Sequence, residues 1–411
     1  MDEMIKAAVD DGRAHGLVLG RRIGDRVETA AAGLRGPGGA ALTAATPFPV
    51  ASITKPATAT LLHALAARGA LDLDAPVLHG ASPRSLLRHT GGVGPGWRGD
   101  LAALGHGDDA LARYAERTDL IEPLGASWSY GNPGYWLAGH HAAVAAGTSF
   151  EEALREHVLA PAGMEGADCR PWADDPTALA HDDTDPRRSS YLAMPRARVP
   201  SGGMRATVAD VLAFAAATWP GGVFGELGVL GSGADTAYAE AYGGRLWGPG
   251  WEAWRAADGT IVAGHSGVYG GFRTRLWSVP ARRTAVAVLA VGKGSENTVL
   301  GLALRAVEAT TGLIEPPLES GPMREPLSGY AGVYARDTAR HEVEADGESL
   351  RVRTVDPATG ESSVVTARPL AGDAFLTEGT HAPGRHVEFL RGADGTITHI
   401  RPGLVAARRI G

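Results

Sequence analysis

Apolar residues follow two different spacings along the chain, and these spacings divide it into segments. Residues 2–14 have the spacing of a helix. Two strand-like runs, 17–23 and 26–32, flank the turn pair Gly24-Asp25, which suits a β-hairpin. We therefore expect the chain to open with a helix and two paired strands.

The spacing is mainly helical from about residue 56 to 220 and becomes strand-like after Gly248. The expected helices are 57–68, 101–117, 135–146, 150–159 and 208–219. The expected strands are 251–255, 260–263, 271–277 and 284–291, and a helix over 296–311 comes after them. Strands at both ends with helices between them predict one α/β domain, in which a sheet flanked by helices closes around an α-helical insert.

The rest of the chain predicts a linker and a second domain. Residues 315–326 contain four prolines and few apolar residues, so they are expected to link a first domain, 1–314, to a second one. Residues 327–411 alternate polar and apolar side chains over short runs separated by turns. This pattern predicts a small antiparallel β domain, either a sandwich or a barrel.

Composition and charge exclude several classes of protein. The formal charge of -7 provides no overall basic field, so neither nucleic acid nor a membrane surface is an expected partner. The single cysteine, Cys169, excludes an internal disulfide and a cysteine-cluster metal site. The acidic residues at 1–4 are unlike a secretory signal, so we expect a cytoplasmic protein. The sequence indicates no metal and no cofactor.

The strongest chemical signal is the pair Ser52 and Lys55 in a Ser-x-x-Lys motif. One helical turn separates them, so the two side chains can touch. A serine hydroxyl needs an adjacent base to become a good nucleophile, and a desolvated lysine with a lowered pKa can be that base. The alternative is a helix-capping serine and a solvated lysine. With 18 serines and three lysines in the chain, chance supplies only about 0.13 such matches.

The second signal is Tyr130-Gly131-Asn132, in a loop before the expected helix 135–146. A phenol beside a lysine ammonium can exist as phenolate and shuttle a proton, and a nearby carboxamide can bind a substrate amide. The alternative is a surface tyrosine in a turn. With nine tyrosines and two asparagines in the chain, chance supplies about 0.04 such matches.

The third signal is His265-Ser266-Gly267, at the end of the expected strand 260–263. This motif is weak alone, because chance supplies about two His-x-Gly matches and residues 89–91 provide another. The motif becomes informative because it follows the first two motifs along the chain. At a strand edge, a glycine would let a substrate approach the backbone and pair with it as an added strand.

Other candidate sites are weaker. The GxGxxG match at 94–99 contains a proline and lies between helical segments, which argues against a nucleotide site. No GxSxG is present, which argues against an α/β-hydrolase. The acidic segment 174–185 could ligate a metal, but a solvated loop is the simpler interpretation. Four tryptophans could line an acyl pocket or pack in the core, namely Trp97, Trp247, Trp251 and Trp254.

With these motifs in this order, the chain resembles the serine β-lactamase and penicillin-binding protein superfamily, in its branch of class C-like hydrolases. The resemblance covers about residues 1–312. Further segments that carry it are 86–92, 130–139, 160–164 and 202–210. It implies a serine β-lactamase/DD-peptidase-like sheet flanked by helices, with an α-helical subdomain.

The resemblance also implies a role for each motif residue. Ser52 would be the acylated nucleophile, Lys55 and Tyr130 the proton relay, and His265 the first residue of the third motif. The implied substrate-binding residues are Asn132, Ser266, Gly267 and Val268. The backbone amides of Ser52 and Val268 would form the oxyanion hole.

One departure from the family pattern bears on function. True β-lactamases of this branch carry a lysine where this chain has His265, and histidine there resembles esterases, DD-peptidases, D-aminopeptidases and the cyclising thioesterases of nonribosomal peptide assembly. Those thioesterases pair the catalytic domain with a lipocalin-like barrel. We therefore interpret the chain as a peptide cyclase with a preference for D-residues, acting on a small-molecule or peptidyl ester or thioester.

Several points stay open at this level. One candidate partner is a carrier protein of a nonribosomal peptide synthetase, which would deliver the thioester. The first alternative function is a D-stereospecific peptidase, amidase or esterase. The second is a β-lactam-binding sensor or a weak β-lactamase.

Overall fold

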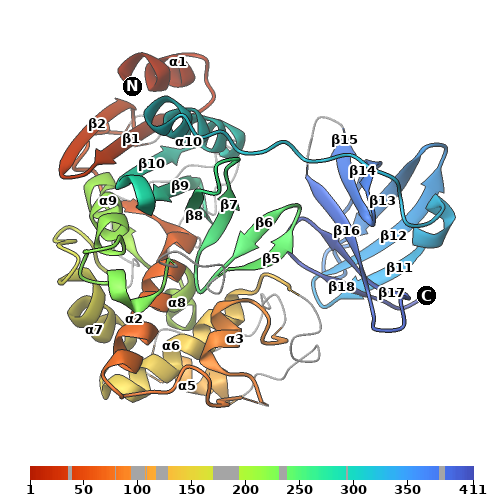
Figure 1. Cartoon of the computed structure of the whole chain (residues 1–411), viewed down its shortest axis with the longest axis horizontal. Helices are drawn as coiled ribbons and strands as arrows, with labels where there is room; N and C mark the ends of the chain where they lie inside the picture. Colours follow the sequence, from red (N-terminus) through yellow and green to blue (C-terminus); the bar gives the residue numbers. More distant parts are fainter. Residues whose placement is uncertain are drawn as a thin grey trace.

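The chain folds into a larger domain of sheet and helices and a smaller barrel, joined by an extended segment (Figure 1). This computed structural model describes residues 1–35, 39–78, 80–93, 107, 109–116, 128–169, 194–230, 238–292, 295–378 and 385–411. The GxGxxG match, Trp97 and the acidic segment 174–185 lie outside the described residues.

The larger domain is built on one antiparallel sheet of eight strands, in the order β2-β1-β10-β9-β8-β7-β6-β5. The strands are β1 (Gly16–Ile23), β2 (Arg26–Gly33), β5 (Ala239–Tyr242), β6 (Arg245–Trp247), β7 (Glu252–Arg255), β8 (Ile261–Tyr269), β9 (Phe272–Val279) and β10 (Thr284–Val291). Because β1 pairs with β10, the two ends of the domain meet within one sheet. This confirms the expected α/β fold, with a sheet that closes around a helical insert.

Strand β10 is buried on both faces of the sheet. Ala287 and Leu289 face one hydrophobic core, whereas Val286 and Val288 face the other. The helices that pack on the two faces are α9 (Val208–Ala217) on the first, and α1 (Asp2–Asp10) and α10 (Glu296–Thr311) on the second. A strand covered on both faces consists of nearly continuous apolar residues, and this pattern is why the strand could be predicted from the sequence.

The helical insert surrounds one deeply buried helix, α2 (Thr54–Ala67). Its other elements are α3 (Pro83–Leu87), α5 (Ala110–Ala115), α6 (Asn132–Ala146), α7 (Phe150–Leu154), a π-helical turn (Arg155–Leu159), α8 (Val199–Gly202) and the paired β3 (Phe48–Pro49) and β4 (Arg205–Ala206). Among the helices that the structure describes, none has the length and apolar character needed to cross a membrane.

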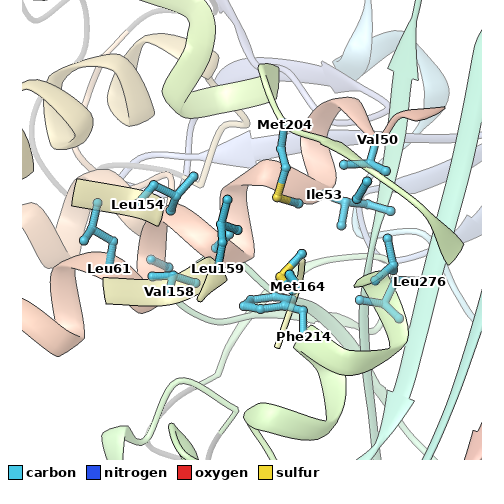
Figure 2. Packing of buried hydrophobic residues seen from close by; sticks show 14 of the residues in the cluster. Val50, Ile53, Leu61, Leu154, Val158, Leu159, Met164, Met204, Phe214 and Leu276 are labelled. Atoms are coloured by element: carbon cyan, nitrogen blue, oxygen red, sulfur yellow. The ribbon is translucent and has the colours of Figure 1, made fainter. Parts of the chain in front are cut away.

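The packing around α2 fixes the start of that helix against the sheet. Figure 2 shows Leu61 of α2 facing Leu154 and Val158, with Ile53 on the side of Leu276 from β9. All five side chains are at most 2% exposed. The middle of α2 is therefore held by packing from the insert, and the turn before the helix by packing against the sheet.

The C-terminal domain is a closed barrel of eight antiparallel strands. The strands are β11 (Gly332–Arg336), β12 (Ala339–Asp346), β13 (Ser349–Val355), β14 (Ser362–Ala371), β15 (Ala374–Glu378), β16 (His386–Arg391), β17 (Ile397–Pro402) and β18 (Ala407–Arg409). Pairing of β18 with β11 closes it. Aromatic rings such as Tyr334 and Phe389 fill the interior, as expected for a barrel of this size. Of the two expected architectures, the structure contains the barrel.

Several helices differ in length from the sequence prediction, among them the first helix and α6. The first helix ends at Asp10 instead of reaching residue 14, because Gly12 adopts a left-handed φ of +71°. Helix α6 begins at Asn132, earlier than the expected 135, because Pro133 suits the first turn of a helix. Tyr130 therefore lies two residues before a helix instead of in the middle of a longer loop.

Within the sheet, strands β5 and β6 were not predicted from the sequence, and β8 is longer than predicted. The sequence predicted a strand end at residue 263, but β8 continues through the third motif to Tyr269. Gly264 lies where β8 packs tightly on β9: a Cβ there would be 2.0 Å from the Leu276 carbonyl oxygen. Glycine at this position allows close packing and does not end the strand.

Candidate active site

Ser52 lies in a short 3-10 turn, η1 (Ala51–Ile53), that leads into α2. Ala51 has a left-handed φ of +50°, a conformation that costs a non-glycine residue about 1–2 kcal/mol. The Thr54 hydroxyl holds this turn, because it donates to the Ala51 carbonyl at 2.7 Å and accepts from the Met204 amide at 3.0 Å. A strained turn that the surroundings hold in this way is characteristic of a functional site.

Lys55 is completely buried beside this serine. Its Nζ donates to Ser52 Oγ at 3.0 Å and to the Ser201 carbonyl at 2.9 Å, and it lies 4.8 Å from the centre of the Tyr130 ring. Burial lowers the pKa of Lys55 well below its usual value, and the charge of Arg198 acts in the same direction. A neutral amine at this position can accept the Ser52 proton.

Tyr130 completes the contact around the nucleophile. Burial raises the pKa of Tyr130 far above its usual value, and the hydrogen bond of its hydroxyl with Ser52 only partly offsets this. The resting side chain is therefore a neutral phenol, and burial disfavours the phenolate considered from the sequence. A neutral phenol next to the nucleophile can donate a proton to a departing group.

His265 places an uncharged ring at the same site. Its ring centre lies 6.1 Å from that of Tyr130 and 5.4 Å from that of Trp247. Burial lowers the pKa of His265 to about 3, and the charge of Lys55 acts in the same direction. Its Nδ1 lies 2.6 Å from the Ser266 carbonyl oxygen, which favours the tautomer with the proton on Nδ1 and leaves Nε2 as an acceptor.

Ser266 is joined to a charged network on the sheet. Its Oγ accepts a hydrogen bond from Arg275, which also forms an ion pair with Glu252 at 2.7 Å. Burial acts to raise the pKa of Glu252, but Arg275 and Arg245 together lower it to about 2. The Ser266 hydroxyl is thus engaged by an arginine, and its implied contact with substrate stays a prediction.

Gly267 lies where β8 crosses η1, the turn that carries the nucleophile. A Cβ at this position would be 2.2 Å from the Val50 carbonyl oxygen and 2.2 Å from Thr274 Oγ1. Gly267→Ala is therefore expected to displace β8 and lower kcat/KM by about 100-fold. In the control Gly301→Ala, the new Cβ meets only the flexible end of Arg305, at 3.3 Å. This control should keep full activity, and Gly267→Ala with wild-type activity would contradict the prediction.

Asn132 begins α6, and Val268 lies near the end of β8. Asn132 is half-buried at the start of α6, two residues after Tyr130. Val268 is 50% exposed, on the part of β8 beyond its pairing with β7, which ends at Gly264. Among the described strands, none pairs with this stretch on the β7 side, which is the arrangement that an added strand requires. The oxyanion role of the Ser52 and Val268 amides and the substrate contact of Asn132 stay predictions.

His89 belongs to the site although sequence reasoning set it aside as a chance match. Its ring centre lies 4.4 Å from that of Tyr130. Its Nδ1 accepts from the Gly131 amide at 3.1 Å, and its carbonyl accepts from the Ser129 amide at 3.0 Å. Its membership of the segment 86–92, which carried the family resemblance, was the signal that could have identified it.

An aromatic wall borders the site and includes a residue from the barrel. Trp247 and Trp128 pack with ring centres 5.1 Å apart, and Leu404 from the turn between β17 and β18 joins their cluster. Trp251 and Trp254 instead lie in the two cores of the larger domain. Of the tryptophans proposed for an acyl pocket, Trp247 is therefore the one that the described structure places at the site.

Comparisons with known proteins find both similar sequences and similar structures. A family model described as beta-lactamase matches residues 1–310. Penicillin-binding protein 4 from Amycolatopsis lactamdurans is 29% identical over 352 residues, which cover 76% of this chain and 91% of that protein.

Similar solved structures include one that extends over both domains. A structure of SurE covers 100% of this chain and 98% of its own, with a TM-score of 0.77 and 23% identity. SurE with D-Leu matches with a TM-score of 0.78 at the same identity and coverage. D-amino acid amidase from Ochrobactrum anthropi SV3 covers 75% of this chain and 99% of its own, with a TM-score of 0.62 and 21% identity. At these identities the likeness shows the fold.

Proposed function

Because this chain belongs to the beta-lactamase family of serine hydrolases, we propose that it is a peptide cyclase. It takes a peptide delivered as a thioester, forms an acyl-Ser52 intermediate and releases a macrocycle by attack of the peptide's own amine. Family membership establishes the serine-hydrolase chemistry, and the proposal concerns the acyl group and its acceptor. The observation that best supports this proposal is that the third motif is uncharged and lies in a site that the barrel helps to enclose.

Acylation relies on the three groups that meet at the nucleophile. Ser52 Oγ attacks the thioester carbonyl while its proton passes to the neutral Lys55 amine. The amides of Ser52 and Val268 receive the developing oxyanion in this proposal. As the carbon–sulfur bond breaks, Tyr130 gives its proton to the leaving sulfur and regains one from Lys55. The products are a free thiol and acyl-Ser52.

Release reverses these proton transfers with a different nucleophile. The peptide's amine attacks the ester carbonyl and loses a proton to the Lys55–Tyr130 pair. The bond to Ser52 Oγ then breaks, and the oxygen recovers a proton from the same pair. The products are a lactam and the free enzyme, so that protons and bonds balance over the cycle.

Because His265 is neutral, the site favours a substrate that has no carboxylate next to this histidine. A lysine in the third motif would offer a positive charge, whereas a histidine with a pKa of about 3 is uncharged near neutral pH. An uncharged ring gives little attraction for a carboxylate. A thioester has no negative charge at its carbonyl end, so it fits this site better than a β-lactam or a free peptide terminus does.

The enclosure of the site supports an amine acceptor over water. Leu404 of the barrel packs against the cluster that contains Trp128 and Trp247, and apolar groups around an acyl-enzyme slow its hydrolysis. Among the similar proteins, one is a D-amino acid amidase and another was solved with D-Leu. These two similar proteins motivate the proposed D-preference.

The test uses linear peptidyl thioesters that differ only in the configuration of the residue at the carbonyl end. We expect the D-epimer to react at least about tenfold faster, which corresponds to about 1.4 kcal/mol of discrimination, and to yield mainly the cyclic product by chromatography. An N-acetylated D-peptide is the matched control, because it lacks the amine and should yield only hydrolysis. Loading the same peptide on a carrier protein tests whether such a partner delivers it.

Other outcomes would favour the alternative functions. Hydrolysis without cyclisation but with D-preference would favour a D-stereospecific peptidase or amidase. Hydrolysis indifferent to configuration, with fast cleavage of simple p-nitrophenyl esters, would favour an esterase. Stable acylation by penicillin without recovery of free enzyme would favour a β-lactam-binding sensor.

A further inference from the structure

The segment that carries Tyr130 is held from two opposite sides. On one side, the amides of Ser129 and Gly131 donate to the carbonyl and the ring of His89. On the other side, the Tyr130 amide donates to the Leu404 carbonyl of the barrel at 2.9 Å. The amides of Ser129 and Gly131 thus point to one side and the Tyr130 amide to the other, as in a β-strand that pairs with a strand on each side.

The barrel makes two further polar contacts with this segment. Arg401 of β17 is buried and donates from Nη1 to the Trp128 carbonyl at 2.8 Å. The Ala406 amide donates to Ser129 Oγ at 3.1 Å. An ion pair with Glu388 of β16 holds the Arg401 guanidinium, which also lies over the Trp128 ring at 5.4 Å. Three consecutive residues, 128–130, are therefore each bonded to the barrel.

A second element of the larger domain docks on the same face of the barrel. The Gly243 amide, in the turn between β5 and β6, donates to Glu388 at 2.6 Å. A Cβ at Gly243 would lie 2.6 Å from the His386 ring, so the turn fits closely against β16. Figure 1 shows this β5–β6 hairpin reaching from the sheet to the barrel. The hairpin carries Trp247, whose ring borders both Tyr130 and His265.

From these contacts we infer that the barrel helps to form the catalytic centre, and that its residue Arg401 is a positioning residue for Tyr130. Arg401 touches no reacting atom. It ties the backbone before Tyr130 to the barrel, and through Glu388 it ties the same barrel strands to the hairpin that carries Trp247. This inference rests on the role proposed above for Tyr130 in acyl transfer.

Loss of positioning has a chemical signature that simple instability lacks. A proton donor matters most when the leaving group is a strong base, and least when the group departs readily as an anion. A displaced Tyr130 should therefore slow reactions of alkyl esters much more than reactions of p-nitrophenyl esters. A fall in the amount of folded protein would slow both in the same proportion.

The experiment measures kcat/KM, which reports acylation alone, for the full chain on an ethyl ester and a p-nitrophenyl ester of one acyl group. Arg401→Met should lower kcat/KM on the ethyl ester by about 100-fold, as a displacement of about 1 Å can, and on the p-nitrophenyl ester by less than about tenfold. Leu404→Ala, a change on a turn that keeps the backbone bonds, should show the same selectivity to a smaller degree.

Matched controls separate this inference from its premises. Arg391→Met breaks a charged network away from the larger domain, with Asp373 of the barrel and Glu325 of the linker, and should leave both rates unchanged per folded molecule. Tyr130→Phe should show the full leaving-group selectivity. If it does not, the proposed role of Tyr130 fails.

Two results would overturn the inference itself. The first is that Tyr130→Phe is selective while Arg401→Met and Leu404→Ala are not. The second is that Arg391→Met is as selective as Arg401→Met. Because Leu404→Ala deletes only a side chain on a turn, it decides the question even where Arg401→Met fails to fold.

Discussion

Ser52→Ala is expected to abolish turnover of esters and thioesters, with kcat falling on the order of 10⁴-fold or more. Among the residues that the structure describes, Ser52 is the hydroxyl that contacts both the buried amine of Lys55 and the phenol of Tyr130. Without it the pair has no attacking oxygen to activate, and water at the same place lacks the positioning that η1 supplies.

The measurement is the steady-state rate with a p-nitrophenyl ester. Ser149→Ala provides the control, since Ser149 caps α7 by accepting from the Glu152 amide at 3.2 Å and should affect stability only. If Ser52→Ala kept more than about a hundredth of the wild-type rate, Ser52 would not be the nucleophile.

Lys55→Met and Tyr130→Phe are each expected to lower kcat on an ethyl ester by about 10³-fold, and the double variant by little more. The reason is that both side chains serve one proton transfer around Ser52. Once either is lost, the other no longer completes the relay. A double-mutant cycle on that ester measures this directly. Losses that multiply, to about 10⁶-fold, would mean that the two residues have separate roles.

The buried state of Lys55 also sets the direction of the pH dependence. Its amine must be neutral to accept a proton, and burial lowers its pKa well below the usual value. Activity is therefore retained below the usual lysine pKa and is lost only as pH falls through the lowered value. The charged or titratable groups that face Lys55 are Tyr130, Tyr135, His89, His265 and Arg198. Burial keeps both histidines neutral. A change of the rate with pH near the usual histidine pKa would therefore contradict the assignment of Lys55 as the base.

The parts of the site that the sequence could predict are those set by local geometry. Ser52 and Lys55 meet because one helical turn separates them, and composition made the motif rare enough to notice. The fold class was also predictable, because β10 is buried on both faces and carries a continuous apolar run. The order of the motifs then identified the family.

The parts that could not be predicted depend on contacts between distant residues. Arg401 and Trp128 are 273 positions apart, and neither has a local pattern that indicates the other. The network of Arg275 and Glu252 forms only because β8 lies between β7 and β9. His89 carried a signal, but a single His-x-Gly match could not be distinguished from chance until its ring was placed against Tyr130.

The proposed mechanism requires that the chain acylates Ser52 and passes the acyl group to an amine. Both steps can be followed by mass spectrometry of the intact protein, quenched during turnover of a D-epimeric peptidyl thioester and then mapped by proteolysis. We expect one acyl group per chain, on the peptide that contains Ser52, which decays at the rate at which macrocycle forms. Macrocycle release by Ser52→Ala, or an acyl group on any other residue, would contradict the mechanism.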